Sequence, residues 1–220
     1  MAVCILIPAY NAEKTIVPVV RECLAHGLPL VVVDDGSADG TAALLSGLPL
    51  TLLRHPYNRG KGAALKTGFA WAISSGFDAV VTIDADGQHD VSAIPRLIEA
   101  ARNGRWDILI ASRHTQFVQM AGLRKFWNRF GVWCIWKRTG FEITDSQSGF
   151  RYYSKELLQG LQLKSDGYSL EMEVLLKTWK SGSTIGSLPI AARVADGRAT
   201  SHYQPVKDTF RISMTFLRYM

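Results

Sequence analysis

The chain has 220 residues, of which 47% are hydrophobic and 20% are charged, and its formal net charge is +6. These values are typical of one folded domain with a full core, and they exclude a disordered chain. A basic protein of this kind binds nucleic acid, an anionic membrane surface or a phosphorylated ligand, and charge alone does not choose among these partners.

The N-terminal apolar run is short and no basic residues precede it, so we expect a first strand there rather than a signal peptide. No stretch reaches the roughly 20 apolar residues that cross a bilayer. The three cysteines, Cys4, Cys23 and Cys134, have no CxxC spacing and are typical of reduced thiols. We therefore expect a cytoplasmic protein without a transmembrane segment, which touches a membrane only at its surface.

In the first half of the chain, apolar runs alternate with helical patterns. The expected strands cover residues 3–7, 30–33, 50–53, 79–83 and 108–111. The expected helices cover residues 12–24, 63–75 and 94–103, with a short helix beginning at Thr41. This alternation predicts an α/β fold, in which a largely parallel sheet has helices on both faces and binds ligands beyond the carboxyl ends of its strands.

Two acidic loops follow expected strands. The first contains Asp34 and Asp35. We expect its carboxylates to bind the hydroxyl and ring N–H groups of a nucleoside. Individually, Asp34 and Asp39 also suit turn and helix-cap positions.

The second acidic loop begins at Asp84 and Asp86, at the end of a buried apolar run. Alternate positions at a strand end place both carboxylates on one side of the chain, where they repel unless a cation or a proton lies between them. Oxygen ligands favour magnesium or manganese over zinc. The alternative is a helix start, in which Asp90 or Ser92 caps the helix expected from residue 94.

Gly60 and Gly62 flank Lys61 at an expected helix start. The sequence has neither the GxGxxG dinucleotide fingerprint nor a P-loop. Lys61 suits a phosphate contact, because free backbone N–H groups lie nearby at a helix N-terminus, but a simple turn explains the segment equally well.

The second half has a different character. Residues 117–138 have a helical pattern with apolar residues at spacings of three and four, interleaved with basic residues and with Trp127, Trp133 and Trp136. This pattern is typical of an interfacial membrane helix, and it also suits a helix packed on the core. Further on we expect strands at 152–153 and 185–194 and a helix at 169–181. The tail, 205–220, is expected to be an amphipathic helix belonging to the same domain as residues 1–204.

Six motifs occur in a fixed order along the chain. They are Ile-Pro-Ala-Tyr-Asn at 7–11, Val-Asp-Asp-Gly-Ser at 33–37, Asn-Arg-Gly-Lys-Gly at 58–62, Asp-Ala-Asp-Gly-Gln-His at 84–89, Ser-Arg at 112–113 and Asp-Ser-Gln-Ser-Gly-Phe-Arg at 145–151. As an ordered set they resemble glycosyltransferase family 2, and within it the dolichyl- or polyprenyl-phosphate mannosyl- and glucosyltransferases. The resemblance implies a GT-A fold with a single, mostly parallel mixed sheet, and an inverting transfer of a hexosyl group from a nucleotide sugar such as GDP-mannose or a UDP-sugar.

The resemblance also implies roles for individual residues. The donor pocket would comprise Pro8, Ala9, Tyr10, Glu13, Asp35, Lys61, Asp84 and Asp86. Asp86 and Gln88 would hold Mg²⁺ or Mn²⁺ on the diphosphate, and Asp145 would lie beside the transferred sugar. Acceptor contacts would come from Arg113, Arg124, Arg129, Arg138, Gln147, Ser148 and His202.

The expected acceptor is a polyprenyl or dolichyl phosphate at an anionic membrane surface. A phosphate nucleophile is already ionised at neutral pH, whereas a hydroxyl acceptor requires a base, for which Asp145 is the candidate. A soluble sugar, a protein or another lipid hydroxyl remains an alternative acceptor. A non-catalytic module that binds anionic membrane or nucleic acid is a further alternative, but acidic loops at the ligand crevice disfavour nucleic acid.

Overall fold

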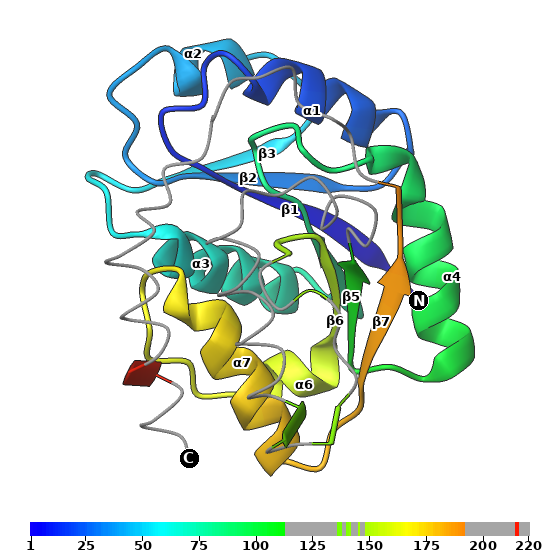
Figure 1. Ribbon diagram of the computed structural model, residues 1–220. Coiled ribbons are helices and arrows are strands. Elements are labelled where there is room, and N and C mark those ends of the chain that lie inside the picture. The colour runs from blue at the N-terminus through cyan, green and yellow to red at the C-terminus, as the bar shows by residue number, and fades with distance from the viewer. Residues whose placement is uncertain (113–135, 138–139, 142–144, 146–147, 192–213, 216–220) are drawn as a thin grey trace, which may run out of the picture.

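The computed structural model describes residues 1–112, 136–137, 140–141, 145, 148–191 and 214–215 (Figure 1). Within this part of the chain the strands form one seven-stranded sheet in the order β3-β2-β1-β4-β6-β5-β7. The strands are β1 (Val3–Ala9), β2 (Leu30–Asp34), β3 (Thr51–Arg54), β4 (Ala79–Thr82), β5 (Ile108–Ser112), β6 (Arg151–Ser154) and β7 (Ile185–Pro189). β6 pairs antiparallel with both of its neighbours, β4 and β5, whereas the other pairings are parallel. The predicted α/β architecture with a mixed, mostly parallel sheet is confirmed.

Helices cover both faces of this sheet (Figure 1). One face packs against α1 (Ile16–Leu24), α2 (Thr41–Leu45) and α4 (Ile94–Gly104), which follows the short 3₁₀ helix η1 (Val91–Ala93). The opposite face packs against α3 (Lys61–Ser74), α6 (Lys155–Gly160) and α7 (Ser169–Lys180).

Strand β1 shows why the sequence forms a buried central strand. Its alternate side chains Ile5 and Ile7 enter the core under α1, while Cys4 and Leu6 enter the core under α3. Side chains on a strand alternate between faces, so a strand covered on both faces must be apolar at every position. All seven residues of β1 are buried.

The topology brings several chain segments to one edge of the sheet. The parallel strands β1, β2, β4 and β5 end there, at Ala9, Asp34, Thr82 and Ser112. Because β6 runs antiparallel to β4, its start at Arg151 pairs with Thr82 at the same edge. The residues just before β6 therefore lie next to the loop that follows β4.

Several predicted boundaries change. Helix α1 begins at Ile16 instead of residue 12, because the Ala12 carbonyl accepts from the Thr15 and Ile16 amides in a turn. β7 ends at Pro189, short of the predicted residue 194. Helix α6, which the sequence analysis did not predict, is capped by Ser154, whose Oγ accepts from the Leu157 amide.

The predicted amphipathic segments 117–138 and 205–220 lie outside the described residues, except for the helical pairs 136–137 and 214–215. Across the described ranges, no helix is both long and apolar enough to span a bilayer.

Candidate active site

The loop after β4 carries the two carboxylates Asp84 and Asp86. Gly87 has a φ of +73°, a left-handed conformation that glycine adopts without strain and that allows the turn. The Asp86 Oδ1 accepts from the Gln88 amide at 3.0 Å, which holds the turn together. Asp90 caps the short helix η1 by accepting from the Ser92 amide, whereas α4 begins behind Ala93 without a side-chain cap. Asp90 is therefore a cap, as predicted, but of the 3₁₀ turn that precedes the expected helix.

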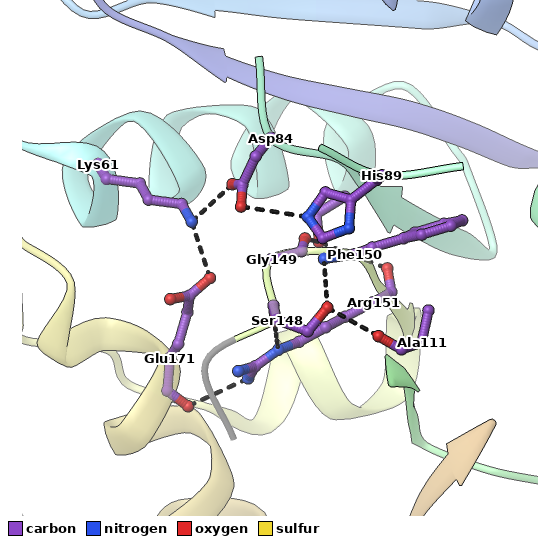
Figure 2. A network of polar contacts seen from close by, with 10 residues as sticks. Lys61, Asp84, His89, Ala111, Ser148, Gly149, Phe150, Arg151 and Glu171 are labelled. Atoms are coloured by element: carbon purple, nitrogen blue, oxygen red, sulfur yellow. Dashed lines mark hydrogen bonds and ion pairs between the residues drawn. The ribbon is translucent and has the colours of Figure 1, made fainter. Parts of the chain in front are cut away.

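Asp84 lies between two nitrogen groups (Figure 2). Its Oδ1 is 2.6 Å from the Lys61 ammonium, and its Oδ2 is 3.4 Å from Nε2 of the buried His89. Burial alone would raise the pKa of Asp84, but the Lys61 charge and the His89 contact outweigh it and hold the pKa far below its ordinary value. Asp84 is therefore an anion whose partners are protein side chains.

Lys61, in the first turn of α3, meets a second carboxylate that the sequence analysis missed. Its ammonium is 3.0 Å from Oε1 of Glu171 in α7 and 5.6 Å from the ring centroid of Tyr168. Burial would lower the pKa of Lys61, but the charges of Asp84 and Glu171 raise it above its ordinary value. Lys61 thus links the loop after β4 to α7, which are 87 residues apart at positions 84 and 171.

The segment 148–151 supports this cluster from below (Figure 2). The Ser148 hydroxyl donates to the Ala111 carbonyl at 2.7 Å, while the fully buried Arg151 donates to the carbonyls of Ser148 and Glu171. A side chain at Gly149 would place its Cβ 2.5 Å from the Asp84 carboxyl carbon. Glycine is therefore required for this segment to approach Asp84.

Asp145 is fully buried. Burial tends to lower the pKa of Arg151, but the neighbouring ionisable groups Tyr153, Glu171 and Asp145 outweigh it, so the pKa of Arg151 is raised. Asp145 therefore lies within electrostatic reach of a permanent guanidinium charge in the protein interior. Its predicted place beside the transferred sugar stays a prediction.

Asp86 has the opposite electrostatic environment from Asp84. Burial and the negative charge of Asp84 raise the pKa of Asp86 above its ordinary value. His89, the Gln88 amide and Lys61 act in the opposite direction but do not outweigh these two effects. A cation beside Asp86 would therefore stabilise its charged form. Within the described residues, no three His, Cys, Asp or Glu side chains converge as a metal site. Asp86 and Gln88 nevertheless fit Mg²⁺ or Mn²⁺, because such ions are commonly held by one or two protein ligands, with phosphate oxygens and water completing the shell.

The loop after β2 uses its carboxylates differently. Asp35 is 2% exposed, and it accepts from His55 Nδ1 at 2.6 Å and from the amides of Arg59 and Gly60 at 3.0 and 2.7 Å. Asp35 therefore anchors the segment that leads into α3 and Lys61, and its predicted contact with a nucleoside stays a prediction.

Asp34 and Asp39 occupy turn and cap positions, as their sequence context suggested. Asp34 Oδ1 accepts from the Ser37 amide at 3.0 Å, and its Oδ2 pairs with Arg54. Asp39 accepts from the amide and hydroxyl of Thr41 at the start of α2.

The end of β1 carries the remaining predicted donor contacts. Pro8 and Ala9 are buried, and the Ala9 carbonyl accepts from the Asp35 amide at 2.8 Å. Tyr10 is partly exposed, and Glu13 Oε2 accepts from the Gly40 amide at 2.9 Å. These contacts join the β1 and β2 loops into one rim of the crevice.

Among the predicted acceptor residues only Ser148 is described, and its hydroxyl holds the segment before β6 in place. The others lie outside the described residues: Arg113, Arg124, Arg129, Arg138, Gln147 and His202. The predicted acceptor site therefore remains a prediction.

The carboxylate–lysine cluster lies at the carboxyl edge of a doubly covered sheet, which is where such folds bind ligands. The sequence matches glycosyl transferase family 2 over residues 4–161, a range that contains β1 to β6 and every site residue described so far except Glu171 and Tyr168. The chain belongs to glycosyl transferase family 2.

This glycosyltransferase is similar to several curated enzymes over most of its length. It is 32% identical to a UDP-N-acetylglucosamine–dolichyl-phosphate N-acetylglucosaminyltransferase from Methanococcus voltae, covering 84% of this chain and 83% of the relative. It is 30% identical to an undecaprenyl-phosphate mannosyltransferase from Micrococcus luteus, covering 86% and 83%. It is also 30% identical to a polyprenol monophosphomannose synthase from Mycolicibacterium smegmatis, covering 84% and 75%.

Solved structures confirm the GT-A fold of the transferase. Glucosyl-3-phosphoglycerate synthase from Mycobacterium tuberculosis, in complex with Mn²⁺, uridine diphosphate and phosphoglyceric acid, superposes with a TM-score of 0.76 at 23% identity. The match covers 99% of this chain and 78% of the synthase.

Proposed function

We propose that the enzyme transfers a hexosyl group, with inversion and metal dependence, from a nucleotide sugar to a polyprenyl or dolichyl phosphate. The observation that carries the donor half is the Asp84–Asp86–Lys61 cluster at the carboxyl edge of the sheet. The acceptor half is supported by three relatives, at least 30% identical, whose names specify dolichyl phosphate, undecaprenyl phosphate or polyprenol.

The donor's diphosphate would be held by Asp86 and Gln88 through Mg²⁺ or Mn²⁺, an ion whose chemical contribution is to offset negative charge on the departing nucleotide. Support for this ion comes from the poorly balanced charge of Asp86 and from the Mn²⁺ and uridine diphosphate in the synthase of the same fold. Asp84, already balanced by Lys61, would face the ribose or the sugar. The loops ending β1 and β2 would hold the nucleoside.

The reaction would be a single displacement. An acceptor oxygen forms a bond to the anomeric carbon as the bond to the diphosphate oxygen breaks, and the electron pair leaves with the nucleotide. A lipid phosphate needs no base, so Asp145 would only position the sugar. Asp145→Asn should then lower the rate with a polyprenyl phosphate less than about tenfold, whereas removing a general base typically lowers a rate by about 10² to 10⁴.

The lipid phosphate would be bound by the predicted acceptor arginines, Arg113, Arg124, Arg129 and Arg138. The amphipathic segments 117–138 and 205–220 would hold the enzyme peripherally at an anionic membrane surface. Flotation with vesicles of phosphatidylcholine and phosphatidylglycerol at low salt tests this. Failure of the enzyme to float with these vesicles would contradict a membrane-surface enzyme.

The decisive experiment has two stages. First, thermal shifts with UDP, GDP, UDP-N-acetylglucosamine, UDP-glucose and GDP-mannose, with and without MnCl₂, identify the donor. Second, the stabilising nucleotide sugar is incubated with a short-chain polyprenyl phosphate, with the corresponding free polyprenol as the matched control. Metal-dependent transfer to the phosphate alone supports the proposal, and transfer to the alcohol or only to water contradicts it.

A further inference from the structure

The Glu171 carboxylate forms an ion pair with Lys61 in the interior of the protein. Glu171 lies in the first turn of α7 with its carboxylate 3.0 Å from the Lys61 ammonium. The Glu171, Lys61 and Asp84 side chains are only 10%, 15% and 22% exposed, so the contacts form in a poorly solvated environment where ion pairs are strong.

The helices α3 and α7 are held together without this carboxylate. The Ala63 amide donates to the Asp166 carbonyl at 3.0 Å, and Lys66 pairs with the Asp166 side chain. A Cβ on Gly62 would lie 2.7 Å from the Asp166 carbonyl carbon, so the first turn of α3 lies directly against the segment before α7. Arg151 donates to the main-chain carbonyl of Glu171, a contact that does not require the carboxylate.

The carboxylate instead fixes the position of one ammonium group. Lys61 contacts three groups from two segments: Asp84 in the loop after β4, and Tyr168 and Glu171 at the start of α7 (Figure 2 shows the two ion pairs). A lysine side chain loses rotamer entropy when it is held in one geometry. In this site the protein's own side chains provide that ordering, and a preordered side chain favours tight binding of a ligand.

Two effects of Glu171 on an anionic donor oppose each other. As a negative charge beside Lys61, Glu171 competes with a diphosphate for the ammonium and repels it. As a fixed partner, Glu171 keeps the ammonium where the diphosphate or the sugar arrives. Removal of the Glu171 charge would therefore strengthen donor binding if competition dominates, and weaken it if positioning dominates.

We infer that Glu171 is a positioning residue for the nucleotide-sugar donor and acts through Lys61. This inference rests on the proposed function, because it requires that Lys61 contacts the donor. Glu171→Gln keeps the size of the side chain but removes the charge that orients Lys61. We expect the variant to bind the donor about tenfold more weakly, which corresponds to 1.4 kcal/mol.

The test is isothermal titration of wild type and variants with UDP-N-acetylglucosamine and with GDP-mannose, both in MnCl₂. Asp166→Asn is the matched control, because it removes an ion pair between the same two parts of the fold without touching Lys61. We expect this control to bind the donor like wild type. In a Lys61→Met background, Glu171→Gln should cause no further loss, because the residue through which it acts is gone.

The outcomes are separable. If wild type binds neither nucleotide sugar, the proposed function fails. If wild type binds and Glu171→Gln binds equally well or more tightly, the positioning role is wrong and charge competition prevails. A loss of affinity that Asp166→Asn reproduces, or that persists in the Lys61→Met background, would show a general loosening of α7 and would also overturn the inference.

Discussion

Two loops of this enzyme have nearly the same sequence pattern and use their carboxylates in opposite ways. After β2, Asp35 accepts three N–H groups from its own chain, two of them backbone amides. After β4, Asp84 binds the Lys61 side chain, and Asp86 keeps a raised pKa because burial and Asp84 disfavour its charge.

The difference between the loops suggests a way to distinguish a carboxylate that stabilises the fold from one that binds a ligand. Backbone amides that bind a carboxylate fix the fold and leave little need for an external cation. A carboxylate buried beside another carboxylate is destabilised until a cation arrives. We therefore expect the β2 loop to contribute more to stability and the β4 loop more to catalysis.

The substitution Asp86→Ala is the strongest test of the difference between the two loops. Because the folded state disfavours the charge of Asp86, its removal should not lower the midpoint of urea unfolding. Sugar transfer measured with MnCl₂ should fall by about 10³-fold or more, the scale of losing a major electrostatic contribution. Asp90→Ala, which removes only a helix cap in the same loop, is the control. Retained transfer by Asp86→Ala would refute the metal assignment.

Asp35→Asn tests the other loop. Asparagine replaces one acceptor oxygen with an N–H donor that faces the His55 or backbone N–H groups, so we expect a loss of about 2–4 kcal/mol in the free energy of unfolding. Urea denaturation followed by circular dichroism measures it. A variant as stable as wild type, with donor binding abolished, would instead place Asp35 chiefly on the nucleoside.

A pair of glycine substitutions sharpens the contrast. Gly149→Ala would push against the Asp84 carboxylate, a side-chain end that can shift, so transfer should fall about 10–100-fold while stability changes little. Gly36 has a φ of +71°, and a Cβ there would lie 2.6 Å from the Tyr57 Cα. Gly36→Ala should therefore lower the free energy of unfolding by about 2–3 kcal/mol. Equal effects of the two variants on stability would contradict the division between the loops.

The smallest expected effect is on the stability of the protein at low pH. Glu173, fully buried in α7, resembles Asp35 in accepting two backbone amides, those of Lys164 and Ser165, and it also pairs with Lys177. Burial would raise its pKa, but these contacts lower it from 4.5 to about 2.

A carboxylate whose pKa is lowered by folding stabilises the protein above its unfolded pKa, and this contribution disappears as pH falls from about 4.5 towards 2. Unfolding midpoints measured across this range should decline less steeply for Glu173→Gln than for wild type. A steeper decline in the variant would have the wrong sign for this linkage.

Much of the framework followed from the sequence. The apolar, β-branched runs predicted β1, β2 and β4 to within two residues at each end, because strands buried on both faces have few other solutions. The acidic residues at their ends predicted loops that share one edge of the sheet. The cap at Asp90 followed from local spacing.

The missed features depend on contacts between distant segments. Nothing local indicates that β6 inserts antiparallel between β4 and β5, because strand order is decided by packing. Glu171 resembles any acidic residue in a first helical turn until the fold brings it to Lys61. The sequence around Gly60 and Gly62 suited a phosphate contact by Lys61 or a simple turn, and nothing in it indicated that both glycines allow the close approach of Asp166.

The place of β6 has a consequence for how such enzymes diversify. β5 ends at Ser112, and just before β6 the Ser148 hydroxyl donates to the Ala111 carbonyl at 2.7 Å. The stretch between them therefore leaves and re-enters the sheet at adjacent points. Doubling the length of a closed loop raises the free energy of closing it by only about 0.6 kcal/mol. A connection whose two ends are held close together can therefore be exchanged or lengthened without disturbing the strands. Under the proposed function this stretch carries most of the acceptor residues, so acceptor choice would evolve there while the donor residues stay unchanged.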